Sequence, residues 1–190
     1  MSYKEYYKPT AKGFAACDSE TERYRWVTAP YCAGVGVDVA SQGVPVVPWA
    51  ISYDLPEPEF SKYSNGRPPK GPLHLRGFAD RLPFESSSLD FVYSSHFLED
   101  VFDWLPVLKE WNRVLRIGGH MIILVPDKER WFAAIQKGQP PNCEHRHEAR
   151  VGELSEVFAQ YFGHYDILKD EFTNVTPEDY TILFVARRVR

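Results

Sequence analysis

The sequence predicts an α/β domain in which a mostly parallel sheet is covered by helices on both faces. Short runs rich in valine and isoleucine alternate with longer stretches of helical periodicity, which is typical of parallel strands joined by crossing helices. A short turn around Pro177 separates the last two apolar runs and predicts a C-terminal antiparallel hairpin. The length of 190 residues fits one domain, and we expect residues 1–30 to form a helical extension of it.

Composition and charge exclude several classes of protein. Hydrophobic residues make up 44% of the chain and charged residues 25%, as in globular proteins. No apolar run approaches the ~18–20 residues of a membrane span, and residues 1–12 lack the apolar segment of a secretory signal. A net charge of −4 and a pI near 5.9 disfavour nucleic acid as a partner. Cys17, Cys32 and Cys143 are widely spaced and suit free thiols in a reducing compartment, so we expect a cytoplasmic protein.

The first helix is expected over residues 19–27. Asp18 or Ser19 can cap it, and Glu22 stands three residues after Ser19 as in a capping box. The valine-rich run at residues 34–40 then predicts a strand that is buried on both faces, as in a parallel sheet.

The connection from this strand to the next is unusually short. Residues 41–49 contain a glycine and two prolines, so they cannot hold a helix of normal length, although a parallel crossover usually takes a dozen or more residues. A second strand is expected at residues 50–54. Residues 55–72 hold five prolines and two glycines, which predicts a long exposed loop of the kind that often carries function.

The remaining elements follow from hydrophobic periodicity. Between residues 104 and 115, apolar residues recur at the spacing of one helical face, with Asp103 as the N-terminal cap and Gly118 and Gly119 as the stop. Further strands are expected at residues 73–77, 89–93 and 120–125, further helices at 128–137 and 151–162, and terminal strands at 165–172 and 180–187.

Side chains that suit ligand binding follow each of the first four predicted strands, where open α/β sheets bind their ligands. The candidates are Asp38, Ala40, Ser41 and Gly43 after the first strand, Asp54 after the second, Ala79, Asp80, Arg81 and Leu82 after the third, and Ser94, Ser95 and His96 after the fourth. Asp54 can accept hydrogen bonds from a ribose diol, and Asp80 can accept one from an adenine amine. A single aspartate more often caps a turn, but their joint order favours a nucleotide-like ligand.

Three stretches resemble the class I S-adenosylmethionine-dependent methyltransferases, in particular the short bacterial "methyltransferase type 11" kind: ADRLPF at residues 79–84, LDFVYSSHFLE at 89–99 and LKEWNRVLRIGGH at 108–120. The resemblance covers roughly residues 31–125. It implies a Rossmann-like, doubly wound sheet that is mostly parallel with an antiparallel C-terminal strand. It further implies S-adenosyl-L-methionine as cofactor and methyl transfer to the O or N of a small or glycan-like acceptor.

The same resemblance assigns roles to the candidate residues. It implies that Asp38 lies at the methionine end of the cofactor, Asp54 at the ribose and Asp80 near the adenine. Leu82 or Phe84 can then pack on the adenine ring. Ser94, Ser95 and His96 are then expected to line the methyl-transfer pocket. His96, with an ordinary pKa near ~6.5, can act as the base that takes a proton from the acceptor. An equally good interpretation is that His96 only forms a hydrogen bond with a neighbouring strand.

The first loop departs from the family pattern of acid-x-Gly-x-Gly. Ala40 and Gln42 stand where that pattern has glycines, and a Cβ at Gln42 either demands an unfavourable backbone or crowds the cofactor. This departure keeps a second hypothesis open, a catalytically inactive methyltransferase-like module that binds a partner or ligand. A nicotinamide-dependent dehydrogenase is a weaker alternative, because no Gly-x-Gly-x-x-Gly opens a helix after the first strand.

The segment at residues 143–148 raises the question of a metal site. It holds one cysteine, two histidines and two glutamates, but His145 and His147 are two residues apart, which points them to different sides of a helix, and no second cluster supports them. We therefore predict no metal, and expect this segment to cap the helix from residue 151 and to line the acceptor side of the pocket.

Overall fold

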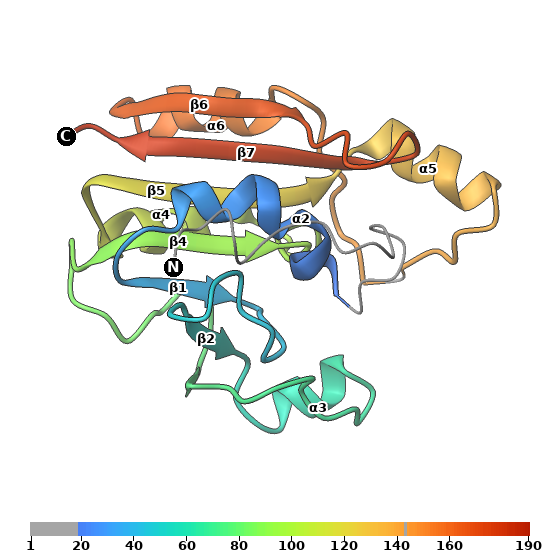
Figure 1. The fold of residues 1–190 in the computed structure, drawn as a ribbon, viewed down its shortest axis with the longest axis horizontal. Helices are drawn as coiled ribbons and strands as arrows, with labels where there is room; N and C mark the ends of the chain where they lie inside the picture. The colour runs from blue at the N-terminus through green and yellow to red at the C-terminus, as the bar shows by residue number, and fades with distance from the viewer. Residues whose placement is uncertain (1–18, 143) are drawn as a thin grey trace.

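A computed structural model describes residues 19–142 and 144–190. These residues build a seven-stranded sheet in the order β3-β2-β1-β4-β5-β7-β6 (Figure 1). The strands are β1 Gly36–Val39, β2 Ile51–Asp54, β3 Leu75–Arg76, β4 Leu89–Ser95, β5 Leu115–Pro126, β6 Tyr165–Phe172 and β7 Thr181–Arg188. Neighbouring strands are parallel from β3 to β5, and β7 runs antiparallel to both β5 and β6. The predicted doubly wound sheet with a C-terminal hairpin is confirmed.

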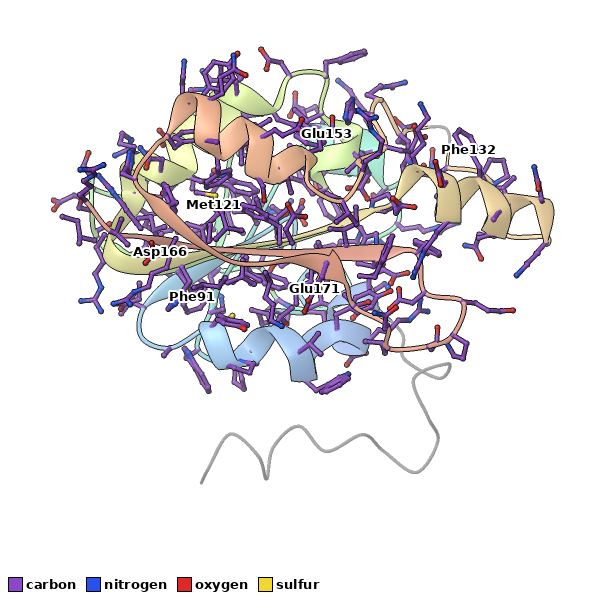
Figure 2. The ribbon with its side chains drawn as sticks, turned by 90° about the horizontal axis from the view of Figure 1, so that it is seen from above. Phe91, Met121, Phe132, Glu153, Asp166 and Glu171 are labelled. Atoms are coloured by element: carbon purple, nitrogen blue, oxygen red, sulfur yellow. The ribbon has the colours of Figure 1, made fainter. Side chains whose placement is uncertain are left out.

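Helices cover both faces of this sheet. They are α2 Glu20–Thr28, α3 Glu59–Tyr63, α4 Trp104–Val114, α5 Lys128–Gln136 and α6 Glu153–Tyr161, with short 3₁₀ turns η2 Ala29–Tyr31 and η3 Leu98–Asp100. In Figure 2 the sheet lies nearly edge-on, with α4 and α6 on one side and α2 on the other. Among the described residues, no helix is both long and apolar enough to cross a membrane.

Each face of the sheet has its own hydrophobic core. Successive residues of β4 alternate between the two: Val92 packs with Trp111 of α4, whereas Phe91 and Tyr93 pack with Tyr24 of α2. All of these side chains are buried. This alternation is the reason why the central strands are apolar almost throughout, since both of their faces exclude water.

The predicted caps are present. Ser19 Oγ accepts a hydrogen bond from the Glu22 backbone N–H at 3.1 Å, which is one half of the expected capping box. Asp103 Oδ1 accepts one from the Leu105 N–H at 3.0 Å at the start of α4. Both side chains satisfy N–H groups that the first turn of a helix otherwise leaves unpaired.

The boundary between α4 and β5 differs from the prediction. The chain passes from α4 directly into β5 at Leu115, although a strand was expected only from residue 120. Leu115 is buried and pairs with Leu89 of β4, so strand pairing begins before the glycines instead of after them. Gly118 keeps a left-handed φ of +83° inside the strand, a conformation open to glycine.

The expected loop at residues 55–72 is not wholly irregular. It contains α3, which Phe60 anchors with a buried side chain. The short connection between β1 and β2 is confirmed, because residues 40–50 form turns without a helix. As a result, the face that a first crossover helix would cover is covered by α2 and by the turns around Val46 and Val47, which are both buried.

Candidate functional site

A cavity of about 310 Å³ opens at the carboxyl ends of β1, β2 and β4. The N-terminal end of α2, the segment around α3 and the start of η3 complete its wall. The lining residues are Ser19, Glu20, Thr21, Val39, Ala40, Ser41, Gln42, Tyr53, Asp54, Leu55, Phe60, Tyr63, Ser64, Lys70, Gly77, Ala79, Ser95, His96, Phe97 and Asp100. This is the edge of the sheet at which the sequence predicts a site.

The structure brings together half of the predicted site residues. The cavity is lined by Ala40, Ser41, Asp54, Ala79, Ser95 and His96. It is not lined by Asp38, Gly43, Asp80, Arg81, Leu82 or Ser94. Gln42, which the sequence places in the first loop, also lines the cavity. Several polar lining residues were missed, among them Glu20, Tyr63 and Asp100. They come from a helix N-terminus and short helical turns, neither of which has a sequence signal that indicates the cavity.

Asp54 ends β2 and ties the first loop to the sheet. Its Oδ2 accepts a hydrogen bond from the Gln42 backbone N–H and its Oδ1 one from the Leu55 N–H, both at 2.8 Å. Burial raises the pKa of this carboxyl group, and the two backbone hydrogen bonds oppose that rise. The carboxylate therefore holds two backbone segments at the cavity floor.

The loop after β1 has the left-handed backbone conformation that glycines usually adopt. Ala40 has φ +63° and Gln42 has φ +50°, so both occupy the left-handed region despite their Cβ atoms. Such conformations cost of order 1–3 kcal/mol in non-glycine residues. Ser41 between them shares a hydrogen bond of 2.6 Å with Ser52 Oγ on β2. The unfavourable backbone that the sequence suggested for Gln42 is thus present, and the loop keeps its path in spite of the substitutions.

The proline-rich segment is attached to this loop. The Gln42 carbonyl oxygen accepts hydrogen bonds from the Lys70 N–H at 2.8 Å and the Gly71 N–H at 3.3 Å. Phe60 and Tyr63 of α3 line the cavity from the same segment. Residues 55–72 therefore form one wall of the cavity.

Asp38 and Ser94 lie in strands but not at the cavity. Asp38 is fully buried, and its Oδ2 accepts a hydrogen bond of 2.6 Å from the Val46 N–H. Burial raises the pKa of its carboxyl group well above the usual range. Ser94 Oγ donates to the Val39 carbonyl oxygen at 3.2 Å. Because strand side chains alternate between faces, Asp38 points away from Val39, which does line the cavity.

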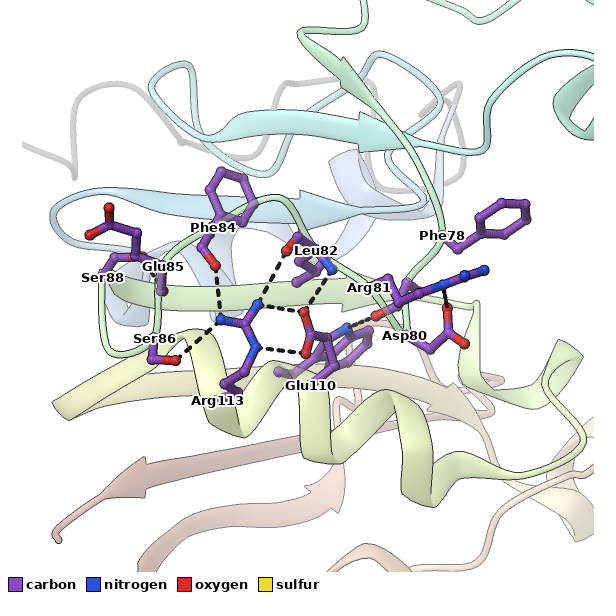
Figure 3. A network of polar contacts seen from close by, with 12 residues as sticks. Phe78, Asp80, Arg81, Leu82, Phe84, Glu85, Ser86, Ser88, Glu110 and Arg113 are labelled. Carbon is purple, nitrogen blue, oxygen red and sulfur yellow. Dashed lines mark hydrogen bonds and ion pairs between the residues drawn. The ribbon is translucent and has the colours of Figure 1, made fainter.

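The segment at residues 79–84 is held by α4 (Figure 3). Glu110 accepts a hydrogen bond from the Leu82 N–H at 2.7 Å, and Arg113 donates to the carbonyl oxygens of Phe84 and Leu82. The Leu82 side chain is buried in the core. Asp80 forms a 3.6 Å ion pair with the exposed Arg81.

Of this segment, only Ala79 lines the cavity. Asp80, Arg81 and Leu82 were expected at the cofactor site, but none of them lines the cavity. Packing in the core turns the Leu82 side chain inward, whereas the Asp80 and Arg81 side chains are exposed at the surface.

His96 lies between the cavity and β7. Its Nδ1 is 3.1 Å from Ser95 Oγ, and its Nε2 is 3.1 Å from Thr181 Oγ1. The ring stacks on Tyr24 with a centroid distance of 5.9 Å. Burial lowers the pKa of this imidazole, so its neutral form, which can accept a proton, prevails at neutral pH.

Acidic side chains gather at the end of the cavity near α2 and η3. Tyr63 donates a 2.5 Å hydrogen bond to Asp100 Oδ2, while Asp100 Oδ1 is buried without a hydrogen-bond partner among the described residues. Burial raises the pKa of Asp100. Glu99 is only 1% exposed, and burial, reinforced by repulsion from Asp100, raises its pKa well above the usual range.

Cys143 lies outside the described residues, whereas residues 144–148 dock on η3. The backbone N–H groups of Arg146 and His147 donate to the Glu99 carbonyl oxygen at 2.7 and 3.0 Å. His145 Nε2 faces Glu99 Oε1 at 4.0 Å, whereas His147 Nε2 is 2.7 Å from Glu153 Oε1. The two histidines diverge, and within the described ranges no three metal-ligating side chains are grouped to hold an ion.

Comparison with known proteins agrees with this geometry. Residues 50–123 match the family described as "Methyltransferase domain". A SAM-dependent methyltransferase of Mesorhizobium loti has a TM-score of 0.62 and 18% identity, covering 93% of this chain and 100% of the other. One from Thermotoga maritima, described as a possible histamine N-methyltransferase, has a TM-score of 0.60 and 20% identity, covering 85% and 86%. At these identities the likeness shows the fold.

Curated relatives match over a shorter segment. The demethylmenaquinone methyltransferase of Staphylococcus haemolyticus is 47% identical over 53 residues, which is 27% of this chain and 22% of the relative. That of Bacillus velezensis is 41% identical over 58 residues, covering 30% and 25%. The chain thus matches only about a quarter of the length of these relatives. The chain therefore contains a segment, residues 50–123, that matches the methyltransferase domain family, and it shares its fold with SAM-dependent methyltransferases of known structure.

Proposed function

We propose that this chain binds S-adenosylmethionine in the 310 Å³ cavity and transfers its methyl group to the O or N of a small acceptor. The observation that carries the proposal is a pair of groups that line one cavity. Asp54 lies beside the first loop, and His96 supplies a half-buried imidazole that is neutral at pH 7. When bound, the cofactor supplies an electrophilic methyl group on its sulfonium.

The residues present fit this cofactor. The cavity is within the usual volume of small-molecule sites, ~300–1,000 Å³. Each Asp54 oxygen accepts one backbone hydrogen bond and has a second lone pair for a ribose hydroxyl. Asp100 Oδ1, buried and unpartnered among the described residues, supplies an acceptor for a cationic group. Glu20 at the same end adds negative charge opposite the positive charges of the cofactor.

The lining also limits the acceptor. Glu20, Asp54 and Asp100 contribute carboxylates, whereas Lys70 is the single lysine among the lining residues that the structure describes, and no arginine is found there. This balance favours an uncharged or cationic acceptor over a phosphorylated one. An amine or a hydroxyl of a small or glycan-like molecule fits this requirement, and His96 is positioned to take its proton.

The alternative is a catalytically inactive module of the same fold. It is favoured by one observation, the left-handed Ala40 and Gln42 in the loop next to the cavity. Their Cβ atoms occupy space that glycines leave to a ligand. In this case the cavity would bind a partner or ligand without turnover.

Calorimetric titration with S-adenosylmethionine and S-adenosylhomocysteine separates the two. We expect micromolar dissociation constants for the wild-type chain and weaker binding by Asp54→Asn. Absence of binding at millimolar ligand contradicts the proposal and leaves the inactive module. If binding is found, a panel of small amines, phenols and sugars then tests for methyl transfer, and binding without transfer to any of them again favours the module.

A further inference from the structure

We propose that Tyr24, Thr181 and Asp179 fix the tautomer of His96, so that its Nδ1 is the atom that accepts the proton of the methyl acceptor through the Ser95 hydroxyl. This inference rests on the proposed function, which it deepens by naming the accepting atom and the residues that position it. Its geometric basis is a continuous row of hydrogen bonds from a buried carboxylate to the wall of the cavity.

The row begins at Asp179, at the turn before β7. Its carboxylate accepts hydrogen bonds from the Tyr24 hydroxyl at 2.9 Å, the Thr181 N–H at 3.0 Å, the Val175 N–H at 3.0 Å and the Thr173 hydroxyl. Backbone N–H groups only donate, so the Asp179 oxygens accept these hydrogen bonds. Asp179 is buried, so its carboxylate is a fixed acceptor at the end of the row.

Each further hydrogen bond then has only one possible direction. The Tyr24 hydroxyl proton is used on Asp179, so Tyr24 accepts from Thr181 Oγ1 at 2.8 Å. The hydroxyl proton of Thr181 is thereby used as well, and its oxygen can only accept from His96 Nε2 at 3.1 Å. A neutral imidazole carries one N–H, which places the proton on Nε2.

The remaining ring nitrogen, Nδ1, lies beside Ser95. His96 Nδ1 bears the lone pair and accepts from Ser95 Oγ at 3.1 Å, and both residues line the cavity. When an acceptor oxygen or nitrogen bonds to the methyl carbon, its own proton passes to Ser95 Oγ while the Ser95 hydroxyl proton passes to Nδ1. The electron pair of the broken sulfur–carbon bond stays on the sulfur. The imidazolium that forms keeps its Nε2–H on Thr181.

Charged groups from several elements face His96, and they oppose one another. Glu20 of α2 and Asp179 favour the protonated ring, whereas Arg23 of α2 and His145 from the segment before α6 disfavour it. Burial outweighs them and keeps the ring neutral before reaction. Tyr24 stays protonated, because burial raises its pKa well above the usual range.

Nitrogen-15 NMR of the cofactor-free chain tests the tautomer without any turnover. Two-bond ¹⁵N–¹H spectra distinguish protonated from unprotonated ring nitrogens. We expect His96 to be the Nε2–H tautomer in the wild type. His74 is an internal reference, because its Nδ1 accepts the Ser52 N–H at 2.9 Å and its tautomer is thus known.

Tyr24→Phe is the decisive variant. It frees the Thr181 hydroxyl to donate to Nε2, so we expect His96 to shift toward the Nδ1–H tautomer. The matched control is Tyr165→Phe, which removes a hydroxyl bonded to Asn112 Oδ1 at 2.9 Å and leaves His96 unchanged. A wild-type Nδ1–H tautomer, or an unchanged tautomer in Tyr24→Phe, overturns the inference. Thr181→Val provides a second variant in case Tyr24→Phe fails to fold.

Kinetics separate positioning from a purely structural role. In Tyr24→Phe we expect kcat to fall by about tenfold, part of the ~10²–10⁴-fold that a positioned base contributes, with KM for S-adenosylmethionine unchanged. A rise in KM with constant kcat contradicts positioning. Failure of the proposed function would appear separately, as a lack of cofactor binding by the wild type with the His96 tautomer still as described.

Discussion

Gly43 and Gly71 meet backbone to backbone, and their contact joins the loop after β1 to the proline-rich segment. A Cβ on Gly43 would lie 2.0 Å from the Gly71 carbonyl oxygen, and a Cβ on Gly71 would lie 2.2 Å from that of Gly43. Neither position has room for a side chain. The two segments that wall the cavity therefore form one unit, held by this contact and by the hydrogen bonds of Gln42 to residues 70 and 71.

Gly43→Ala is expected to separate these two segments. The substitution combines a backbone clash with a φ of +81°, and overpacking alone costs ~1–3 kcal/mol. Gly66→Ala is the matched control, because Gly66 has a similar φ of +75° but nothing within 4 Å of its Cβ. Urea unfolding should show a larger decrease in the free energy of unfolding for Gly43→Ala than for the control. Cofactor binding should also be weaker in Gly43→Ala. An equal decrease in both variants would mean that the contact between Gly43 and Gly71 does not contribute to stability.

Asp54→Ala is expected to weaken S-adenosylmethionine binding by roughly 1–3 kcal/mol, the cost of leaving buried polar groups unpaired. The Gln42 and Leu55 N–H groups that Asp54 now satisfies lose their partner in the free and the bound protein alike, so their loss lowers stability rather than affinity. Asp80→Ala is the comparison, because Asp80 lies outside the cavity with an exposed partner, and its effect should be small. Calorimetry measures both. An unchanged affinity in Asp54→Ala would remove this residue from the site.

The sequence predicted the strands and the cavity edge well, for physical reasons. Asp54 ends β2 and His96 directly follows β4, and both strands run parallel to β1, so their position follows from the order of the strands alone. The α4 helix followed from apolar spacing and from the cap at Asp103. These features depend on local pattern, and they needed no knowledge of tertiary packing.

Other features depend on tertiary contacts and could not be predicted. Asp38 was expected at the cofactor, but the alternation of side chains along β1 turns it to the opposite face. Leu82 was expected beside the adenine, but its side chain packs in the core instead. Glu20 and Asp100 reach the cavity only because α2 and η3 meet there, and they lie 80 residues apart in sequence.

Glu110→Ala is expected to loosen the segment at residues 79–84. Glu110 accepts the Leu82 N–H and pairs with Arg113 at 2.6 Å, so its loss leaves the N–H without a partner at a cost of ~1–3 kcal/mol. Hydrogen exchange should become faster for the Leu82 amide. Glu171→Ala, which breaks the exposed pair with Lys169, is the control and should leave that amide unchanged. Unaltered exchange in Glu110→Ala would show that the segment is held by its packing alone.

Glu99→Gln is expected to alter how stability depends on pH. In the unfolded chain this carboxyl loses its proton near its ordinary pKa of ~4.3, whereas the folded chain, with a raised pKa, keeps it. Above pH ~4.3 the native state therefore binds more protons, and the stability of the wild type falls as the pH rises toward the folded pKa. The Glu99→Gln variant has no such decrease in stability as the pH rises.

Urea unfolding at pH 4, 6 and 8 measures this effect. The stability of Glu99→Gln relative to the wild type should increase with pH. The raised pKa of Asp38 acts in the same direction but is present in both proteins and cancels in the comparison. Glu178→Gln, whose side chain is 80% exposed, should show no such trend. A constant difference between Glu99→Gln and the wild type would mean that Glu99 is ionised in the native state.

His96→Asn is expected to reduce turnover and to spare cofactor binding. Asparagine tolerates the left-handed backbone of this position, where φ is +50°, but it has no basic nitrogen, so kcat should fall by ~10² or more. In the wild type the base is lost as the pH falls through the pKa of His96, which burial lowers from its ordinary value. Activity should therefore persist below pH ~6.5, and this acidic limb should be missing in the variant. Loss of S-adenosylmethionine binding by a folded His96→Asn would instead assign the imidazole to the cofactor, and the proton of the acceptor would then need another base.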